Sequence, residues 1–244
     1  VTRTRVIIYE PYPFSMVSGN LRTLTYILQF LDRDRFEPIV VVPFATGLVE
    51  RIEQQLDGAC HVIEPDERLK RYGGQALADG LLGRIATLAA VVRYGIKVAR
   101  FARQQRADVI YCNGIRAVIT VGIMCRCFGI PILWYVKGQL EQRTLDTVGY
   151  ITANRILFQS ESNSRDSYPL LRRLFDYKVG ILPTGLDVAE IDNMGVEQHL
   201  GVELGVTSSN VNVIYMGQLY GPKGVHFLIE AFAQACDEFP GMKL

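Results

Sequence analysis

Six short, almost uniformly apolar runs separated by helical patterns constrain the fold of this chain more than any other feature. The runs lie at residues 5–9, 38–42, 109–112, 132–136, 155–158 and 179–182, and two of them begin with an arginine, Arg5 and Arg155. A strand that is apolar at every position is buried on both faces, which is typical of a parallel sheet. Helical patterns fill the segments between them, at residues 19–31, 48–56, 76–105, 116–128 and 161–174. The alternation predicts an α/β fold, a doubly wound Rossmann-like domain with right-handed crossovers.

This pattern ends near residue 185, and the segment that follows is polar. We therefore expect an N-terminal domain at residues 1–185, a linker at 186–210, and the first strand and helix of a second Rossmann-like domain at 211–244. One strand and one helix cannot enclose a core of their own. We expect the sequence to be a piece of a longer protein, truncated in its second domain.

Composition indicates in which compartment the protein works and whether it binds a metal or a cofactor. Basic and acidic residues number 26 and 25, so the net charge of the whole chain favours no particular partner. The odd number of cysteines favours free thiols in a reducing cytoplasm: Cys60, Cys112, Cys125, Cys127 and Cys236. The three histidines lack metal-ligand spacing, and we expect neither a metal nor a cofactor.

Two segments could present backbone N–H groups to a phosphate. At residues 213–232 a strand, a Gly-Pro-Lys-Gly turn containing Lys223 and a helix follow one another. Ser18-Gly19-Asn20 opens the first helix, where a phosphate contact and an ordinary N-cap are both compatible with the residues. The first strand is not followed by Gly-x-Gly-x-x-Gly, which disfavours a nicotinamide enzyme.

Polar residues follow three of the predicted inner strands. These turns contain Asn113, the pair Lys137-Gly138, and residues 159–162. Ligands of open α/β sheets bind at the carboxyl ends of the strands, so the three turns predict a cleft there. A lysine at a strand end can neutralise a phosphate or a developing leaving-group charge, which makes Lys137 the sharpest candidate.

Three motifs resemble the GT-B glycosyltransferases of family 4, which use nucleotide sugars and retain the anomeric configuration. They are Ser18-Gly19-Asn20, Pro183-Thr184-Gly185-Leu186-Asp187, and the closing segment from Met216-Gly-Gln-Leu219 through Lys223-Gly224 to Ala231-Phe232. The resemblance extends over essentially the whole chain. It implies that the first domain binds the acceptor, that the second binds the nucleotide sugar, and that the sugar is transferred in the cleft between them.

The resemblance also implies residue roles. Gly19, Lys223 and the residue at position 218 would contact the donor diphosphate, while Asn20, Asn113, Lys137 and Gly138 would line the acceptor cleft. At position 218 this chain has Gln218 where the family usually has arginine, which removes a positive charge from the donor site. Thr184 replaces the usual asparagine, and Asn113 and Lys137 stand where histidines are common.

The implied reaction transfers a sugar to a hydroxyl of a glycan or a lipid-linked acceptor, as in polysaccharide biosynthesis. The family's paired glutamates would lie beyond residue 244, so no catalytic residue is assigned and the chain alone is expected to be inactive. Two alternatives stay open. One is another GT-B enzyme, such as a nucleotide-sugar 2-epimerase or a phosphorylase, and the other is a non-catalytic glycosyltransferase-like subunit.

The predicted helix at 76–105 carries basic residues and, after Asp79, no acidic ones. From residue 80 to 107 the bases are Arg84, Arg93, Lys97, Arg100, Arg103 and Arg106. Arg93, Lys97 and Arg100 share one face, and residues 81, 85, 88, 92 and 96 form an apolar face. Such a helix could lie at the inner face of an anionic membrane, or it could pack on the sheet with a solvated basic face. No nucleic-acid recognition motif accompanies it.

Overall fold

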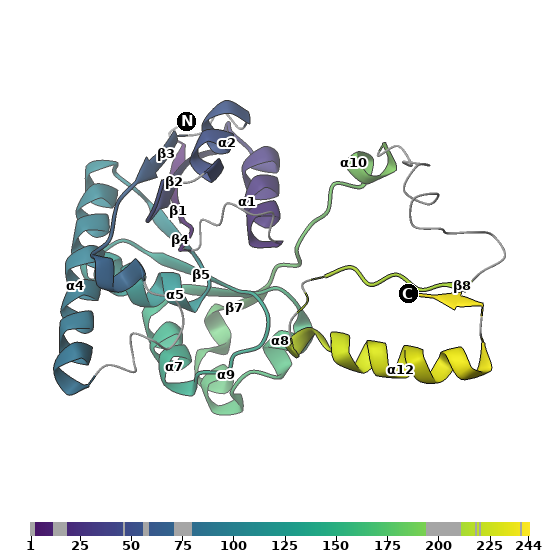
Figure 1. Cartoon of the computed structure of the whole chain (residues 1–244). Helices are drawn as coiled ribbons and strands as arrows, with labels where there is room; N and C mark the ends of the chain where they lie inside the picture. Colours follow the sequence, from purple (N-terminus) through teal and green to yellow (C-terminus); the bar gives the residue numbers. More distant parts are fainter. Residues whose placement is uncertain are drawn as a thin grey trace. The chain divides into compact units, whose positions relative to one another are not determined.

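The computed structural model describes residues 3–11, 19–45, 47–55, 59–70, 80–193, 211–217, 219, 221–239 and 241–244. The chain divides into two compact units, Val1–Leu186 and Asp187–Leu244, which are treated separately below (Figure 1). The predicted linker at 186–210 begins at this division. Its residues 194–210 lie outside the described part of the chain.

The first unit is built on a seven-stranded parallel sheet with the order β3-β2-β1-β4-β5-β6-β7. Its strands are β1 (Thr4–Tyr9), β2 (Phe36–Val42), β3 (Ala59–Val62), β4 (Val109–Asn113), β5 (Ile132–Val136), β6 (Arg155–Phe158) and β7 (Val179–Ile181). Ile7 pairs with Ile39 of β2 on one side and with Ile110 of β4 on the other. The predicted α/β fold with a doubly wound parallel sheet is confirmed.

Helices cover both faces of this sheet (Figure 1). On one face α1 (Gly19–Phe30) and α2 (Gly47–Gln55) pack on alternate residues of the central strands, such as Ile8 and Val40. The other face is covered by α4 (Leu81–Gln104), α5 (Ile115–Ala117), the π-helix η2 (Val118–Gly122), α6 (Ile123–Cys127) and α7 (Arg143–Thr152). Successive strand side chains point to opposite faces, which explains why Ile7 and Ile8 belong to different cores.

Several predicted helices differ in detail. The segment predicted as one helix at 116–128 is α5, η2 and α6 in succession. The segment predicted as one helix at 161–174 is two helices, α8 (Glu161–Arg165) and α9 (Pro169–Phe175). Tyr168 has ψ 112°, because a residue before proline is pushed out of the helical region. The long helix begins at Leu81, and residues 76–79 of its predicted range lie outside the described residues.

Two elements were not predicted, β3 and α7. β3 is a four-residue edge strand with a histidine in it, which gives no continuous apolar run. The described part of this unit also contains two short 3₁₀ turns, η1 (Glu67–Lys70) and η3 (Asp176–Lys178).

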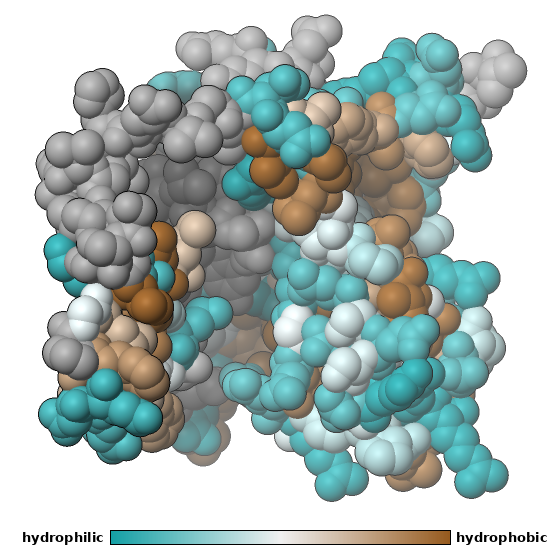
Figure 2. All heavy atoms as spheres, turned by 90° about the vertical axis from the view of Figure 1, so that its right-hand side faces the viewer, coloured by the Kyte–Doolittle hydropathy of each residue, from teal (hydrophilic) through white to brown (hydrophobic). Residues whose placement is uncertain are grey.

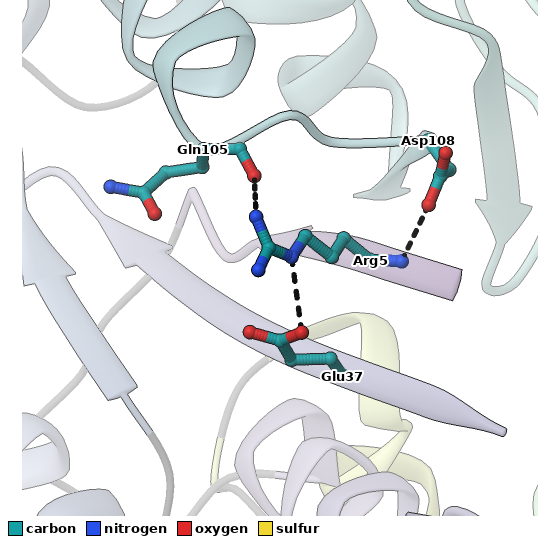
Figure 3. A network of polar contacts seen from close by, with 4 residues as sticks. All are labelled: Arg5, Glu37, Gln105 and Asp108. Atoms are coloured by element: carbon teal, nitrogen blue, oxygen red, sulfur yellow. Dashed lines mark hydrogen bonds and ion pairs between the residues drawn. The ribbon is translucent and has the colours of Figure 1, made fainter. Parts of the chain in front are cut away.

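Arg5 ties three segments together at the amino end of the sheet (Figure 3). Its guanidinium bonds the Glu37 carboxylate of β2 at 3.0 Å and donates to the Gln105 carbonyl, after the last turn of α4, at 3.0 Å. Its backbone N–H donates to the Asp108 carboxylate at 2.7 Å. The C-terminal end of α4 is thereby fastened to β1.

Trp134 of β5, the one tryptophan of the chain, is fully buried under α7. It packs edge to face on Tyr150 with ring centroids 5.9 Å apart. Gly149 lies so close that a Cβ there would be 2.7 Å from the indole ring. The absence of a side chain at Gly149 is what allows α7 to approach β5.

The second unit contains α10 (Val188–Asp192), β8 (Val211–Asn212), the 3₁₀ turn η4 (Gly221–Lys223), α12 (Val225–Glu238) and β9 (Met242–Lys243). β8 and β9 pair in parallel around α12, and the predicted strand at 211–216 is shorter than expected. No described residue of α12 is buried. Apolar side chains also gather in patches on the face of the molecule drawn in Figure 2.

Candidate functional site

The order of the strands places a topological switch point between β1 and β4. The chain runs outward from β1 to β2 and β3, then returns to place β4 on the other side of β1. Connections therefore leave the carboxyl ends of β1 and β4 toward opposite faces, and ligands of open α/β sheets bind at such a switch point. Glu10 follows β1 and Asn113 ends β4, so both belong to this point.

Glu10 and Asn113 form a buried polar pair. Both side chains are buried, and Asn113 Nδ2 donates a hydrogen bond to Glu10 Oε2. The backbone N–H of Glu10 donates to the Val41 carbonyl at 3.1 Å, which fixes the start of the loop after β1. Asn113 Oδ1 is buried and has no hydrogen-bond partner among the described residues. A buried acceptor in that state can receive a hydrogen from a ligand or a water.

Lys137 and Gly138 follow β5, the next strand of the sheet. Burial lowers the pKa of Lys137 to about 8, against the opposing attraction of the Glu10 carboxylate. The Lys137 ammonium lies 5.6 Å from the centre of the Tyr135 ring. Gly138 has a φ of 80°, a left-handed conformation that glycine adopts without strain. A partly buried lysine of this kind switches between cation and neutral amine near physiological pH.

The segment after β7 is bonded to the neighbouring strands. The Tyr135 hydroxyl donates to the Leu182 carbonyl at 3.0 Å and lies 3.2 Å from Thr184 Oγ1. Gln159 Nε2 donates to the same Thr184 oxygen at 2.8 Å. Thr184 is therefore held at the carboxyl edge of β5 and β6.

These residues enclose a hollow of about 390 Å³ beside α1. Its walls are Arg22, Thr23, Tyr26, Lys137, Gly138, Gln159 and residues 184–186. A second hollow of about 240 Å³ shares Thr23, Tyr26 and residues 184–186 with it, and is lined otherwise by apolar and aromatic side chains such as Ile27, Phe30 and Tyr111. The two together offer cations and hydrogen-bond donors beside an apolar wall, which is how small-molecule sites are built.

The structure brings only some of the predicted site residues together. Lys137 and Gly138 line the larger hollow, whereas Asn113 is not among its lining residues and is bonded to Glu10. Gly19 and Asn20 are the first two residues of α1, three and two positions before Arg22. Their predicted contacts with donor and acceptor stay predictions.

The remaining predicted donor residues belong to the second unit. Lys223 is exposed at the end of η4, and Gly224 after it has a φ of 71° and caps α12. The Gly224 N–H donates to the Gly221 carbonyl at 2.9 Å, which closes the turn. Gln218 lies outside the described residues.

The predicted basic face of α4 is exposed. Arg93 pairs with Asp66 at 3.1 Å, and Lys97 donates to the Glu64 carbonyl at 3.2 Å. Arg100 is exposed one turn further along. Of the residues predicted as the apolar face, Leu81, Ile85 and Leu88 are exposed, and Val92 and Ile96 are half-buried. The buried side chains by which α4 packs on the sheet include Tyr94, Val98 and Ala102.

Two further features of the described residues bear on the ligands. No group of three or more His, Cys, Asp or Glu side chains among them could hold a metal ion. Of the helices that the structure describes, none combines the length and apolarity needed to cross a bilayer. The five cysteines are free thiols.

Comparison with known proteins places the fold. No protein-family model matches the chain, and no curated protein matches it. HepE from Anabaena, solved in complex with UDP-glucose, has a TM-score of 0.68 at 18% identity over 95% of this chain and 58% of its own. A glycosyltransferase from Rickettsia africae has a TM-score of 0.68 at 13% identity over 96% and 58% of the two chains.

A UDP-N-acetylglucosamine 2-epimerase from Rickettsia bellii has a TM-score of 0.59 at 11% identity, over 99% of this chain and 61% of its own. These structures are GT-B proteins. The chain has the GT-B fold. It spans less than two thirds of the length of each of these three GT-B structures.

Sequence reasoning missed Glu10 and Arg22 as members of this site. Glu10 stands directly after an apolar run, which is the same signal that predicted Lys137, and a proline-rich turn follows it. Arg22 lies within a helix, where nothing in the sequence distinguishes a residue that faces a hollow from one that faces water.

Proposed function

We propose that this chain belongs to a glycosyltransferase of the family 4 type, which transfers a sugar from a nucleotide sugar to a hydroxyl of a glycan or lipid-linked acceptor with retention of configuration. The observation that carries the proposal is the polar hollow beside the switch point of a GT-B sheet, with Lys137, Gln159 and Thr184 in its wall. The three motifs shared with family 4 support the same reaction.

The first unit is the proposed acceptor side. Gln159 and Thr184 offer neutral hydrogen-bonding groups, and Lys137 and Arg22 offer cations, which suits a ligand that carries both hydroxyls and a negative charge. The apolar hollow that shares Thr23 and residues 184–186 would accept a less polar part of the same acceptor.

The second unit is the proposed start of the donor side. A departing nucleoside diphosphate gains negative charge as the bond to the sugar breaks, and cations and N–H groups aimed at that charge lower the barrier. Lys223 and the amino end of α12 would supply such groups. Gly19 is proposed to contact the same diphosphate. Because Gln218 stands where the family usually has arginine, the proposed diphosphate site would have one positive charge fewer.

We further propose that the reaction uses no metal ion and takes place in the cytoplasm, at the inner face of a membrane. Five free thiols support a reducing compartment.

The test uses the full-length protein that carries this chain. Isothermal titration calorimetry against UDP, GDP and ADP, followed by sugar transfer from the matching nucleotide sugar, identifies the donor. Lys223→Ala is expected to weaken binding of the diphosphate by roughly ten- to a hundredfold, as for a lost charge-assisted hydrogen bond. Lys243→Ala, in β9, is the matched control. Unchanged binding by the Lys223 variant would remove Lys223 from the site.

The same experiment separates the rival functions. Similarity to the Rickettsia bellii epimerase structure favours a nucleotide-sugar 2-epimerase as the second candidate. That enzyme would convert the sugar nucleotide into its C2 epimer without any acceptor. Transfer to an added acceptor supports a glycosyltransferase, and epimerisation alone supports the second candidate. If the protein binds none of the nucleoside diphosphates, the result supports a non-catalytic subunit.

A further inference from the structure

We propose that the outer edge of β3 and the groove beside it bind an extended acidic segment of a partner protein as a further strand. The backbone of the added strand would bond β3, and its carboxylates would bond Lys97 and Arg100 of α4. The inference rests on β3 and α4 alone and does not require the proposed sugar transfer.

β3 has an edge that no described strand covers. It is the last strand in the order of the sheet, and β2 is its strand partner. Ile63, the residue after β3, donates its N–H to the Val42 carbonyl at 2.9 Å, on the side of β2. Because successive residues of a strand direct their backbone groups to opposite sides, the N–H and C=O groups of Cys60 and Val62 face away from β2. A partner strand can pair with such groups.

A groove of about 400 Å³ lies beside the end of β3. Its apolar lining is Val62 and Ile63 from the β3 segment with Ile96 and Phe101 from α4, and its polar lining is Arg93, Lys97, Arg100 and Gln104. These described lining residues include no acidic side chain. On this face of β3 the His61 ring packs on Phe101, with ring centroids 4.9 Å apart. Side chains of an added strand that point to the same face would therefore enter the groove.

The cations of the groove differ in what they already bond. Arg93 pairs with Asp66 at 3.1 Å, and Lys97 donates one hydrogen bond to the Glu64 carbonyl at 3.2 Å. An ammonium has three donors, so Lys97 keeps two for another acceptor. Arg100 is exposed, and its guanidinium bonds no other described residue. A carboxylate brought to this place would form charge-assisted hydrogen bonds, the strong kind.

The spacing of side chains on α4 fits that of an extended segment. Lys97 and Arg100 are three residues apart on the helix, which places neighbours about 5–6 Å apart. Alternate side chains of a strand point to one face and are about 6.6 Å apart. Two glutamates at alternate positions of the added strand would therefore meet the two cations, and their methylene groups would cover Phe101 and Ile96.

Charge complementarity favours an acidic peptide over the other possible occupants. Two copies of this edge joined in one antiparallel sheet would place both α4 helices on the same face, cations against cations. A nucleic acid would satisfy the cations but would leave the backbone groups of Val62 without a strand partner. An extended acidic segment satisfies the backbone and the cations at once.

The first test measures binding of labelled peptides to the full-length protein that carries this chain, by fluorescence anisotropy. The probe alternates Glu and Val over about six residues, the usual length of a strand. A second probe has Lys in place of each Glu, and two more carry N-methyl groups on one or the other set of alternate backbone amides. We expect only the Glu probes to bind. N-methylation should weaken binding at least tenfold on the set of amides that faces β3, and much less on the other set.

The same assay tests the cations. Arg100→Gln should weaken binding of the Glu probe about tenfold, as for a lost charge-assisted hydrogen bond, and Lys97→Gln with Arg100→Gln should weaken it further. Arg103→Gln is the matched control, because Arg103 is exposed on the same helix and is not among the residues that line the groove. It should bind like the parent. Circular dichroism checks that the variants stay folded.

The second test is hydrogen exchange resolved to single residues, which detects the added strand directly. Saturating Glu probe should slow exchange of the Val62 amide, which faces the open edge, by at least about tenfold. The Ile63 amide already donates to the Val42 carbonyl and should change little.

Several results would overturn the proposal. Failure of the Glu probe to bind, equal binding of the Glu and Lys probes, or an equal loss in the Arg103→Gln variant would each remove the groove cations from recognition. Full binding of both N-methylated probes, with no slower exchange at Val62, would make the groove a site for acidic groups in general. Protection of the Val62 amide that grows with protein concentration in the absence of probe would assign the edge to a second copy of the chain.

Discussion

Replacing Lys137 by methionine should stabilise the first unit at neutral pH. Burial lowers the pKa of Lys137 from an ordinary value of 10.5 to about 8. A tenfold change in proton affinity is worth about 1.4 kcal/mol, so keeping this lysine charged in the folded state costs about 3 kcal/mol. Methionine has a similar length without the charge, and it can pack on the Tyr135 ring that Lys137 now covers.

The stabilisation should depend on pH in a defined direction. Below pH 8 the lysine is protonated in both the folded and the unfolded chain, and the whole cost is present. Between pH 8 and about 10.5 the folded chain has released the proton while the unfolded chain still holds it, so the cost shrinks as pH rises. The stability difference between variant and parent should therefore fall from about 3 kcal/mol at pH 7 toward zero near pH 10.5.

Urea unfolding followed by tryptophan fluorescence measures this difference, because the single tryptophan, Trp134, is buried in the strand that precedes Lys137. Other groups that titrate in alkali are common to both proteins and cancel. Lys97→Met, on the exposed face of α4, is the matched control and should change stability by less than about 0.5 to 1 kcal/mol. A Lys137 variant that is less stable at pH 7, or a difference independent of pH, would refute the reasoning.

Two substitutions test the packing and the polar pair. Gly149→Ala should lower the free energy of unfolding by about 1–3 kcal/mol, because its Cβ would press on the Trp134 ring, whereas Gly47→Ala meets nothing within 4 Å and should be close to neutral. Asn113→Ala should cost about 1–3 kcal/mol by removing a buried hydrogen bond to the Glu10 carboxylate, and Asn113→Asp should cost at least as much by placing two carboxylates together. Urea titrations measure the stability of all four variants, and a Gly149→Ala or Asn113 variant as stable as the parent would contradict the described contacts.

Apolar runs were sufficient to predict six of the seven strands and their parallel arrangement in the sheet. They could not reveal β3, because an edge strand needs one apolar face only and His61 interrupts the run. Nor could they locate the break between α8 and α9, where the helical periodicity continues and the conformation of Tyr168 before Pro169 ends the helix. Periodicity records which residues prefer burial, whereas caps and prolines decide where elements stop.

The site was predictable only where a residue belongs to a strand end. Lys137 and Gly138 were found because the turn after a parallel strand always lies at the carboxyl edge. Arg22 was not, because its part in the hollow depends on the rotation of α1 about its own axis. Nor could the sequence show which part of α4 is buried: the predicted apolar residues Leu81, Ile85 and Leu88 are exposed, and the helix packs on the sheet through residues such as Ala90, Ala99 and Ala102.

The bond between Arg5 and the end of α4 has a geometric consequence. Arg5 and Glu10 stand at opposite ends of β1, a stretch of about 17 Å at the usual rise per residue of a strand. The C-terminal end of α4 and the Glu10 carboxylate at the switch point are therefore attached to opposite ends of one strand. A displacement of that end of α4 would reach Glu10 through β1.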